Sequence, residues 1–433
     1  MPLKLLHLSD IHLGSGFSHG RTNPETGLNT RFEDFVATLS RCMDAAIDQA
    51  VDLVLFGGDA FPDATPPPVV QQAFAQQFRR LVDAQIPAVL LVGNHDQHAQ
   101  GQGGASLCIY RTLGIPGFVV GDRLETHRIQ TRGGLVQVVT LPWLTRATLL
   151  TRPETEGLSM GEVGEMLLDR LRVVLEAEIR QLDPEIPTVL LAHVMTDTAR
   201  FGAERFLAVG KGFTVPMSLL ARPCFDYVAL GHVHQHQVLC QQPLMVYPGS
   251  IERVDFSEEK EDKGYAMVSL AKGTAEMTFC PLPTRAFKTV SVNLLKAEDP
   301  NEALLTALGQ QSLTDAVVRL IYKLRTDQVD RIDNAALHAA LAQAHTYTIH
   351  PELVSQLSRP RLPELGTNST LEPIAALQAY LANREDLKDL ADDMLIAAEA
   401  LINQDPVDVL DLPEEQARVD REAEDDNRQL RLL

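Results

Sequence analysis

Residues 89–98, VLLVGNHDQH, pass from a run of apolar side chains through one glycine into Asn94, His95 and Asp96. The short apolar run predicts a buried strand. An amide, an imidazole and a carboxylate have no packing use at the end of such a strand, and buried polar groups need partners. We therefore expect this strand end to carry chemistry.

Four further clusters of polar side chains occupy the same kind of position, each next to the end of an apolar stretch that predicts a strand. They are SDIH with Asp10 and His12, GGDA with Asp59, LAHV with His193, and GHVH with His232 and His234. Ligand sites of open α/β sheets form at the carboxyl ends of strands. Residues two apart in an extended segment point to the same side, so both residues of D-x-H or H-x-H can reach one centre. The neighbouring glycines let the backbone pass close to that centre.

The apolar stretches alternate with helical periods through the first 280 residues. KLLHL, DLVLF and PAVLLV predict strands, and they are separated by helices predicted from Thr30 and over 66–84. Thr30 and Glu33 have the spacing of a capping box. Later strands are predicted for LVQVVTL, TVLLAH, DYVALGH, LMVYP, YAMVSLA and AEMTFCPL, with a helix over 159–182 among them. The pattern predicts an α/β fold with a mixed sheet or a two-sheet sandwich flanked by helices.

The order of predicted strands and helices changes after PLPTRAF, residues 281–287. Residues 283–352 predict a compact β-α-β-α-β unit, and residues 353–370 have the proline-rich, polar composition of a linker. Residues 371–403 have an amphipathic helical pattern, although packing of this helix on its own domain is an alternative to partner docking. Residues 404–433 predict an acidic, mobile tail. The first domain is therefore expected to span residues 1–282.

The composition narrows the class of protein. The chain has 433 residues, a net charge of −20 and five cysteines. No apolar run reaches the roughly 18 residues of a membrane span, no signal peptide is evident, and the cysteines form no C-x-x-C pair. These features predict a cytoplasmic protein with reduced thiols and no membrane association. Residues 384–433 hold 16 Asp and Glu against 6 Lys and Arg, so a local basic groove elsewhere stays possible.

The donor inventory predicts a metal centre. Several imidazoles, two carboxylates and an amide oxygen suit Mn, Fe or Zn, and they are too many for one ion. Two ions sharing a carboxylate, about 3.5–4 Å apart, can clamp both oxygens of a phosphoryl displacement.

Other polar residues are expected to have structural roles or to lie at the surface. We expect His7 to be a core histidine and Asp96 to orient a neighbour, and we place three histidines at the surface or behind the ligands: His98, His127 and His236.

The motifs D-x-H, G-G-D, G-N-H-D, a lone His and G-H-x-H, in this order, resemble the calcineurin-like metallophosphoesterases. LHLSDIHLG at residues 6–14, PGSIERVDFSEEKEDKGY at 248–265 and the small β-α-β-α-β unit resemble, more narrowly, the nuclease subunits of SbcCD-type complexes. The resemblance implies a two-sheet β-sandwich flanked by helices for residues 1–282. It also implies a capping domain for 283–352 and a helical segment at 371–403 that docks on a partner.

The same resemblance implies roles for single residues. One divalent ion, expected to be Mn²⁺, would be held by Asp10, His12, Asp59 and His234. The second would be held by Asp59, Asn94, His193 and His232. His95 would stabilise developing charge or protonate the leaving oxygen while a water activated by both ions attacks phosphorus. The implied partners are an SbcC-like ATPase of the SMC family and DNA with double-stranded ends or hairpins. The implied assembly is a homodimer within a heterotetramer.

One position departs from the family pattern. The family often has His or Asp three residues after the G-D motif, linked to exonuclease action, and this chain has Pro62 followed by Asp63. Either Asp63 substitutes, or the balance of exonuclease to endonuclease activity differs. Two other functions compete with the nuclease hypothesis: a phosphoesterase acting on small or cyclic nucleotides, and a binding scaffold that has lost catalysis.

Overall fold

The computed structural model describes residues 2–98, 104–144, 157–200, 214–354, 373–382, 387 and 390–403. It divides into two compact units, Met1–Val354 and Ser355–Leu433. The predicted linker beyond Val354 and the predicted acidic tail lie outside the described residues. Within the described part, no helix combines the length and apolar character needed to cross a membrane.

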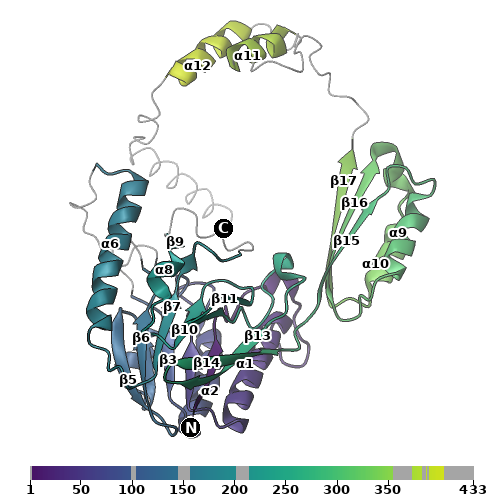
Figure 1. Ribbon diagram of the computed structural model, residues 1–433. Coiled ribbons are helices and arrows are strands. Elements are labelled where there is room, and N and C mark those ends of the chain that lie inside the picture. The colour runs from purple at the N-terminus through teal and green to yellow at the C-terminus, as the bar shows by residue number, and fades with distance from the viewer. Residues whose placement is uncertain are drawn as a thin grey trace, which may run out of the picture. The chain divides into compact units, whose positions relative to one another are not determined.

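The first unit contains a six-stranded mixed sheet (Figure 1). Its strands, in spatial order, are β14 (Thr274–Pro281), β13 (Gly264–Ala271), β1 (Leu3–Leu8), β2 (Leu53–Phe56), β3 (Ala88–Leu91) and β4 (Phe118–Gly121). Strands β1 to β4 are parallel, whereas β13 runs antiparallel to β1 and β14 antiparallel to β13. The carboxyl ends of β1, β2 and β3 therefore lie side by side.

A second six-stranded sheet packs against the first. Its order is β11 (Gln237–Gln241), β12 (Leu244–Tyr247), β10 (Tyr227–Gly231), β7 (Thr188–His193), β6 (Leu135–Leu141) and β5 (Glu125–Gln130). The four inner strands are parallel, and the edge strands β11 and β5 are antiparallel to their neighbours. β7 and β10 are adjacent, so their carboxyl ends also lie together.

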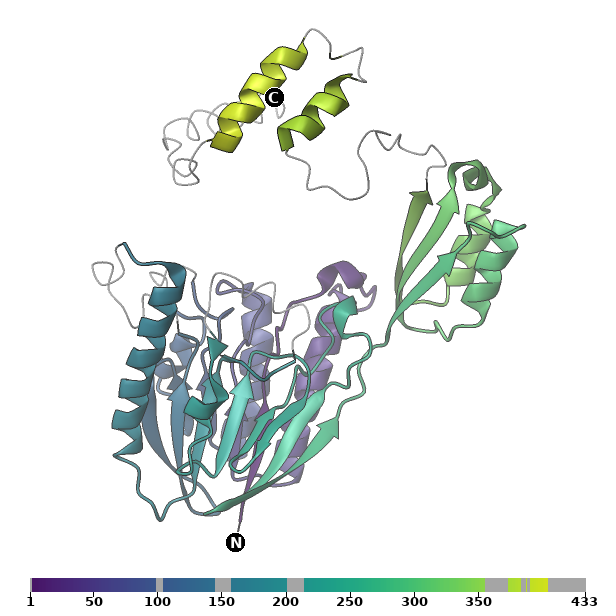
Figure 2. The same cartoon turned by 45° about the horizontal axis from the view of Figure 1, so that its top comes forward.

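Three apolar layers hold this sandwich together. Leu5 of β1 packs in the layer between the sheets, while Leu6 and Leu8 face the helices α1 (Thr30–Asp48) and α2 (Pro68–Asp83). Burial on both faces explains why the consecutive residues Leu5 and Leu6 are both apolar. On the outer side of the second sheet lie α6 (Met160–Ile179) and the short α8 (Met217–Leu220) (Figure 2). The predicted two-sheet sandwich flanked by helices is confirmed.

The start of α1 differs from the prediction. Its N-cap is Asn29, whose side chain accepts a hydrogen bond from the Arg31 N–H. Thr30 instead contacts His345 through its hydroxyl, so Thr30 and Glu33 form no capping box. Asn and Thr are both good caps, and the sequence offered both in adjacent positions. A capping box does begin α6, between Ser159 and Glu162.

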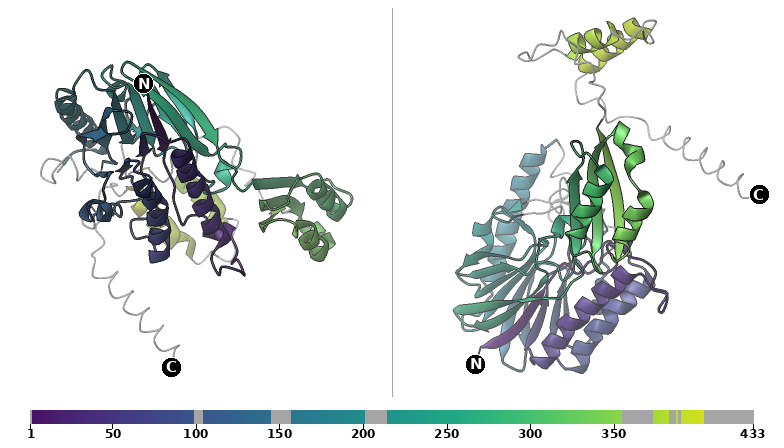
Figure 3. Two further views of the ribbon diagram at one scale, coloured as in Figure 1. Left: turned by 90° about the horizontal axis from the view of Figure 1, so that it is seen from below. Right: turned by 90° about the vertical axis from the view of Figure 1, so that its right-hand side faces the viewer.

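A smaller α/β unit follows the sandwich. β15 (Phe287–Asn293), α9 (Pro300–Gly309), β16 (Val317–Arg325), the 3₁₀ helix η3 (Thr326–Arg331), α10 (Asn334–Leu341) and β17 (Thr346–Val354) form it. The three strands are parallel in the order β15-β16-β17, and α9 and α10 cover one face (Figure 3). Arg285, just before β15, pairs with Asp34 of α1 at 2.7 Å and 2.8 Å. These paired charges join the smaller unit to the sandwich.

The remaining elements are short or separate. They are the 3₁₀ helices η1 (Phe17–His19) and η2 (Phe256–Glu258), α3 (Cys108–Thr112), and the two-residue strands β8 (Met195–Thr196) and β9 (Thr214–Val215). In the second unit, α11 (Pro373–Ala382) and α12 (Ala391–Asn403) occupy the segment for which one helical stretch was predicted. The domain boundaries proposed from the sequence stay predictions.

Candidate metal centre

The site is built where the parallel strands of both sheets end. Asp10 and His12 follow β1, Asp59 follows β2, and Asn94 and His95 follow β3. From the second sheet, His193 is the last residue of β7, whereas His232 and His234 follow β10. Six of the seven predicted ligands are buried, and Asn94 is partly exposed, as is His95.

The backbone at this end of the sandwich is unusual. Four of the predicted ligands adopt positive φ angles without being glycine: Asp10 at 52°, His12 at 45°, Asp59 at 58° and His232 at 105°. Such conformations cost about 1–3 kcal/mol each and concentrate at functional sites. The surroundings must therefore hold these side chains in place against local preference.

The carboxylate of Asp96 helps to hold this strained backbone in place. It accepts hydrogen bonds from the backbone N–H groups of Asp59 (2.9 Å), Ala60 (3.0 Å) and Gly93 (2.9 Å). Burial, together with the nearby Asp59 charge, raises the pKa of Asp96 to about 7. Asp96 thus organises the turn that carries Asp59, as expected from the sequence, and it belongs to none of the three metal-type groups among the described residues.

Glycines make this crowding possible. A Cβ on Gly93 would lie 2.1 Å from Oδ1 of Asp59, and a Cβ on Gly231 would lie 2.1 Å from the carbonyl oxygen of Gly57. Neither contact is tolerable, so any side chain at these two positions would push the strand ends apart.

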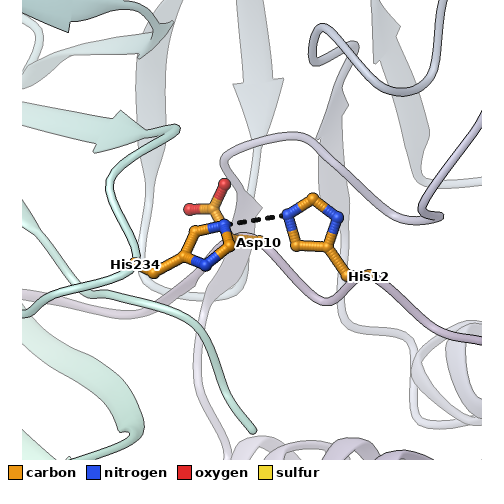
Figure 4. A group of neighbouring side chains, drawn as sticks. All are labelled: Asp10, His12 and His234. Atoms are coloured by element: carbon orange, nitrogen blue, oxygen red, sulfur yellow. Dashed lines mark hydrogen bonds between the residues drawn. The ribbon is translucent and has the colours of Figure 1, made fainter. Parts of the chain in front are cut away.

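The first group of candidate ligands is Asp10, His12 and His234 (Figure 4). Nε2 of His12 lies 3.0 Å from Nε2 of His234 and 3.7 Å from Oδ2 of Asp59. The Asp10 carboxylate accepts the backbone N–H of His232 at 3.0 Å, which ties the first sheet to the second. Three chain segments thus meet at one point.

The second group is Asp59, His193 and His232. Oδ1 of Asn94 lies 2.9 Å from Nε2 of His193 and 2.9 Å from Nδ1 of His232. Oδ2 of Asp59 lies 3.4 Å from Nε2 of His193. The structure therefore brings all seven predicted ligands together in two neighbouring groups, with Asp59 next to both.

Hydrogen bonds behind the ligands fix the orientation of two imidazoles. Nδ1 of His193 donates to the carbonyl oxygen of Gly57 at 2.7 Å, and Nδ1 of His234 donates to Glu258 at 2.6 Å. Because each acceptor can only accept, Nδ1 carries a hydrogen and Nε2 faces the site. This is the arrangement in which histidine binds metals.

Burial and neighbouring charges shift the pKa values of the candidate ligands in different directions. Burial lowers the pKa of His232 to about 3 and that of His12 well below its ordinary value. Burial acts against ionisation of Asp59 and His193, but their mutual attraction prevails: it lowers the pKa of Asp59 and raises the pKa of His193. In the metal-free protein these two residues therefore form an ion pair.

The donor geometry fits divalent cations. With hydrogen on Nδ1, the Nε2 lone pair of a neutral His193 would face the acceptor oxygen of Asn94 at 2.9 Å. That contact is repulsive unless a second proton or a cation lies between the atoms. Nε2 of His232 is buried and has no hydrogen-bond partner among the described residues. Mixed nitrogen and oxygen donors of this kind suit Mn, Fe or Zn.

His95 is oriented by the chain at Pro62. Its Nδ1 donates to the carbonyl oxygen of Pro62 at 2.8 Å, and its backbone N–H donates to Oδ1 of Asp59 at 2.9 Å. The rings of His95 and His12 meet edge to face at 5.0 Å. His95 also falls in a third group with His12 and Asp59, so its separation from the ligands is smaller than the sequence suggested.

Asp63 is placed away from this arrangement. It is exposed, and its Oδ1 accepts hydrogen bonds from the backbone and hydroxyl of Thr65 at 2.8 Å and 3.1 Å. It belongs to none of the metal-type groups found among the described residues. At this departure from the family pattern, the carbonyl of Pro62 contacts the site and the Asp63 carboxylate caps a turn.

Two residues of the site were not among those predicted from the sequence. Trp143 lies beside His232, with ring centroids 4.8 Å apart, and only 6% of its surface is exposed. Glu258 lies behind His234 and is 4% exposed.

The other histidines lie elsewhere. His7 bonds to Tyr227 in the core, His127 lies near Thr140, His236 stacks on Phe279, and His98 is exposed.

Comparison with known proteins places this site in a family. The family model described as calcineurin-like phosphoesterase matches residues 3–236, which include every predicted ligand. Among solved structures, TT1561 of Thermus thermophilus is 15% identical with a TM-score of 0.36, covering 64% of this chain and 99% of that chain. A dimetal phosphatase from Danio rerio is 12% identical with a TM-score of 0.36, covering 65% and 100%. The purple acid phosphatase PPD1 from yellow lupin is 13% identical with a TM-score of 0.37, covering 64% and 52%.

Proposed function

Because the chain belongs to the calcineurin-like phosphoesterases, we propose that it hydrolyses DNA phosphodiester bonds with two divalent ions, preferably Mn²⁺. The observation that carries this proposal is the convergence of seven candidate ligands in two neighbouring groups, with Asp59 next to both. A narrower part of the proposal is that the chain is the nuclease subunit of an SbcCD-type complex.

The residues have distinct tasks in this proposal. Asp10, His12, Asp59 and His234 would hold one ion, and Asp59, Asn94, His193 and His232 the other. When bound, such a pair acidifies water and neutralises charge on a phosphate. Nδ1 of His95 is occupied by the Pro62 carbonyl, so Nε2 is the atom left to meet substrate. To donate to the phosphate or to the leaving oxygen from that atom, the ring would have to carry a hydrogen on both nitrogens.

Two features outside the sandwich favour a nucleic-acid substrate with a protein partner. An additional α/β unit, β15–β17 with α9 and α10, follows the sandwich, and a small-molecule site does not require such a unit. In the second unit, Leu390, Met394 and Ile396 are 53%, 37% and 66% exposed. We take these exposed apolar side chains as the surface that a partner would cover. We propose an SMC-family ATPase as the occupant.

Hydrolysis of small or cyclic nucleotides is the second candidate. The net charge of −20 favours it, because phosphate-backbone binding relies on Lys and Arg. In an SbcCD-type complex the partner would supply part of the DNA affinity.

One experiment separates the candidates. Purified full-length protein is incubated with Mn²⁺ and linear duplex, hairpin DNA or a generic phosphodiester ester, with and without the ATPase. The nuclease proposal expects DNA cleavage that the ATPase and ATP stimulate and that EDTA abolishes. Intact DNA under all conditions, with rapid ester turnover that competing DNA leaves unchanged, would establish the small-molecule alternative.

A further inference from the structure

The carboxylate of Glu258 is shared between the metal centre and a buried lysine. Oε1 accepts from Nδ1 of His234 at 2.6 Å, whereas Oε2 contacts Nζ of Lys263 at 2.8 Å and the backbone N–H of Val254 at 3.1 Å. Lys263 is 1% exposed. Three partners thus hold this carboxylate in place.

His234 is held from two directions by the same pair of residues. Glu258 binds its ring, and Nζ of Lys263 donates to its carbonyl oxygen at 3.1 Å. Rotation of the imidazole would break the bond to Glu258 and leave a buried carboxylate acceptor without its partner, which is costly. The ring is therefore locked with Nε2 facing His12.

The turn that carries Glu258 is anchored in the smaller α/β unit. Phe256 packs on Phe287 of β15, with ring centroids 5.0 Å apart, and lies under the guanidinium of Arg319 at 4.4 Å. The next residue, Glu259, accepts the backbone N–H of Thr289 at 3.0 Å. Adjacent glutamates thus face different parts: Glu258 faces the metal centre and Glu259 faces β15.

We propose that Glu258 is a positioning residue for His234, which fixes the imidazole tautomer that binds one of the two ions. The proposal rests on the two-ion centre proposed above and is independent of the substrate. A carboxylate behind a ligating histidine both orients the ring and increases its basicity, and its loss typically weakens metal binding about 10–100-fold.

The test is calorimetric titration of the full-length, metal-free protein with MnCl₂. In Glu258→Gln we expect one ion to bind about 10–100-fold more weakly and the other with unchanged affinity. Glu259→Gln is the matched control, because it changes the neighbouring glutamate of the same turn, and it should bind both ions like the wild type. Equal affinities in Glu258→Gln and wild type would overturn the proposal, as would equal weakening of both ions.

Two further variants keep the result decisive. Glu258→Asp retains the charge that pairs with Lys263 but is one methylene too short to reach His234, so the same single ion should bind more weakly even if Glu258→Gln does not fold. In a His234→Ala background, Glu258→Gln should cause no additional loss for the remaining ion, because the two residues act as one unit. An additional loss there would assign Glu258 a general structural role.

A wild type that binds fewer than two ions would overturn the proposed two-ion centre. Two bound ions without DNA cleavage would leave the role of Glu258 standing.

Discussion

Nε2 of His12 and Nε2 of His234 lie 3.0 Å apart, although the two residues are 222 positions apart in the chain. Both nitrogens are buried, and the hydrogen bond from Nδ1 of His234 to Glu258 leaves the lone pair of its Nε2 directed at His12. A pair of imidazoles brought together in this way needs a proton or a cation between them. The contact shows that folding brings two candidate ligands from distant segments of the chain within hydrogen-bond distance of each other.

Replacing His95 separates catalysis from metal binding. His95→Asn should retain both Mn²⁺ ions and lower hydrolysis about 10²–10⁴-fold, the usual contribution of a general acid. Ion stoichiometry by calorimetry and cleavage of labelled DNA measure the two effects. Because His95 also lies near His12 and Asp59, a variant that binds only one ion would identify it as a ligand instead.

Asp59 and Asn94 should differ in the number of ions that they control. Asp59 lies next to both ligand groups, so Asp59→Asn should weaken binding of both ions. Among the described residues, Oδ1 of Asn94 lies within hydrogen-bond distance of His193 and His232, which belong to the same group, so Asn94→Ala should weaken one. Titration of each metal-free variant with MnCl₂ gives the stoichiometry. The same defect in both variants would contradict the bridging position of Asp59.

The junction between α1 and the α/β unit predicts a pH-dependent stability difference. Burial opposes ionisation of Asp34, but Arg285 and Arg31 outweigh it and lower its pKa below the ordinary 3.8. Asp34→Asn should reduce the free energy of unfolding by about 2 kcal/mol at pH 7, because it removes charged hydrogen bonds.

The sign of the pH effect follows from linkage. A lowered folded-state pKa gives stability that is fully present above the unfolded-state pKa and is lost as the pH falls through the folded-state pKa. Urea unfolding of wild type and Asp34→Asn should therefore give a constant difference from pH 8 to about pH 4.5. The difference should shrink only below about pH 3.8. A difference that shrinks near pH 6 would point to a histidine as the titrating group.

Removal of residues 371–433 should leave intrinsic Mn²⁺-dependent hydrolysis intact, because every candidate ligand lies in the unit Met1–Val354. The same deletion should abolish co-purification with the SMC-family ATPase. Replacing Met394 and Ile396 by Ser is the finer variant, since both side chains are exposed. Retained association after the deletion would place the docking surface elsewhere.

The strand-end positions were predictable because their signal is local. At VLLVGNHDQH, DLVLFGGD and DYVALGHVH, a polar side chain directly follows an apolar strand, and parallel neighbours bring such ends together. The edge strands β5 and β11 had no comparable signal. β5, ETHRIQ, alternates weakly and is mostly polar, and edge strands are buried too little to need an apolar pattern.

Asp96 lies within one of these strand-end motifs, but the supporting residue Glu258 could not be found in this way. SEEKED at residues 257–262 has the composition of a solvated surface loop, yet the fold buries Glu258 and, beside it, Lys263. Their burial depends on His234 and on the α/β unit, which are remote in sequence or belong to another element. The choice of Asn29 over Thr30 as the cap of α1 is likewise tertiary, because His345 binds the Thr30 hydroxyl.

The indole beside His232 has a practical consequence. Trp143 is the single tryptophan of the chain, so all indole emission originates one ring away from a candidate ligand. Binding of a paramagnetic ion in that half of the centre would quench this emission, whereas an ion confined to the Asp10 half would affect it less. The protein thus carries a built-in optical probe that can tell which of the two positions fills first, without any attached dye.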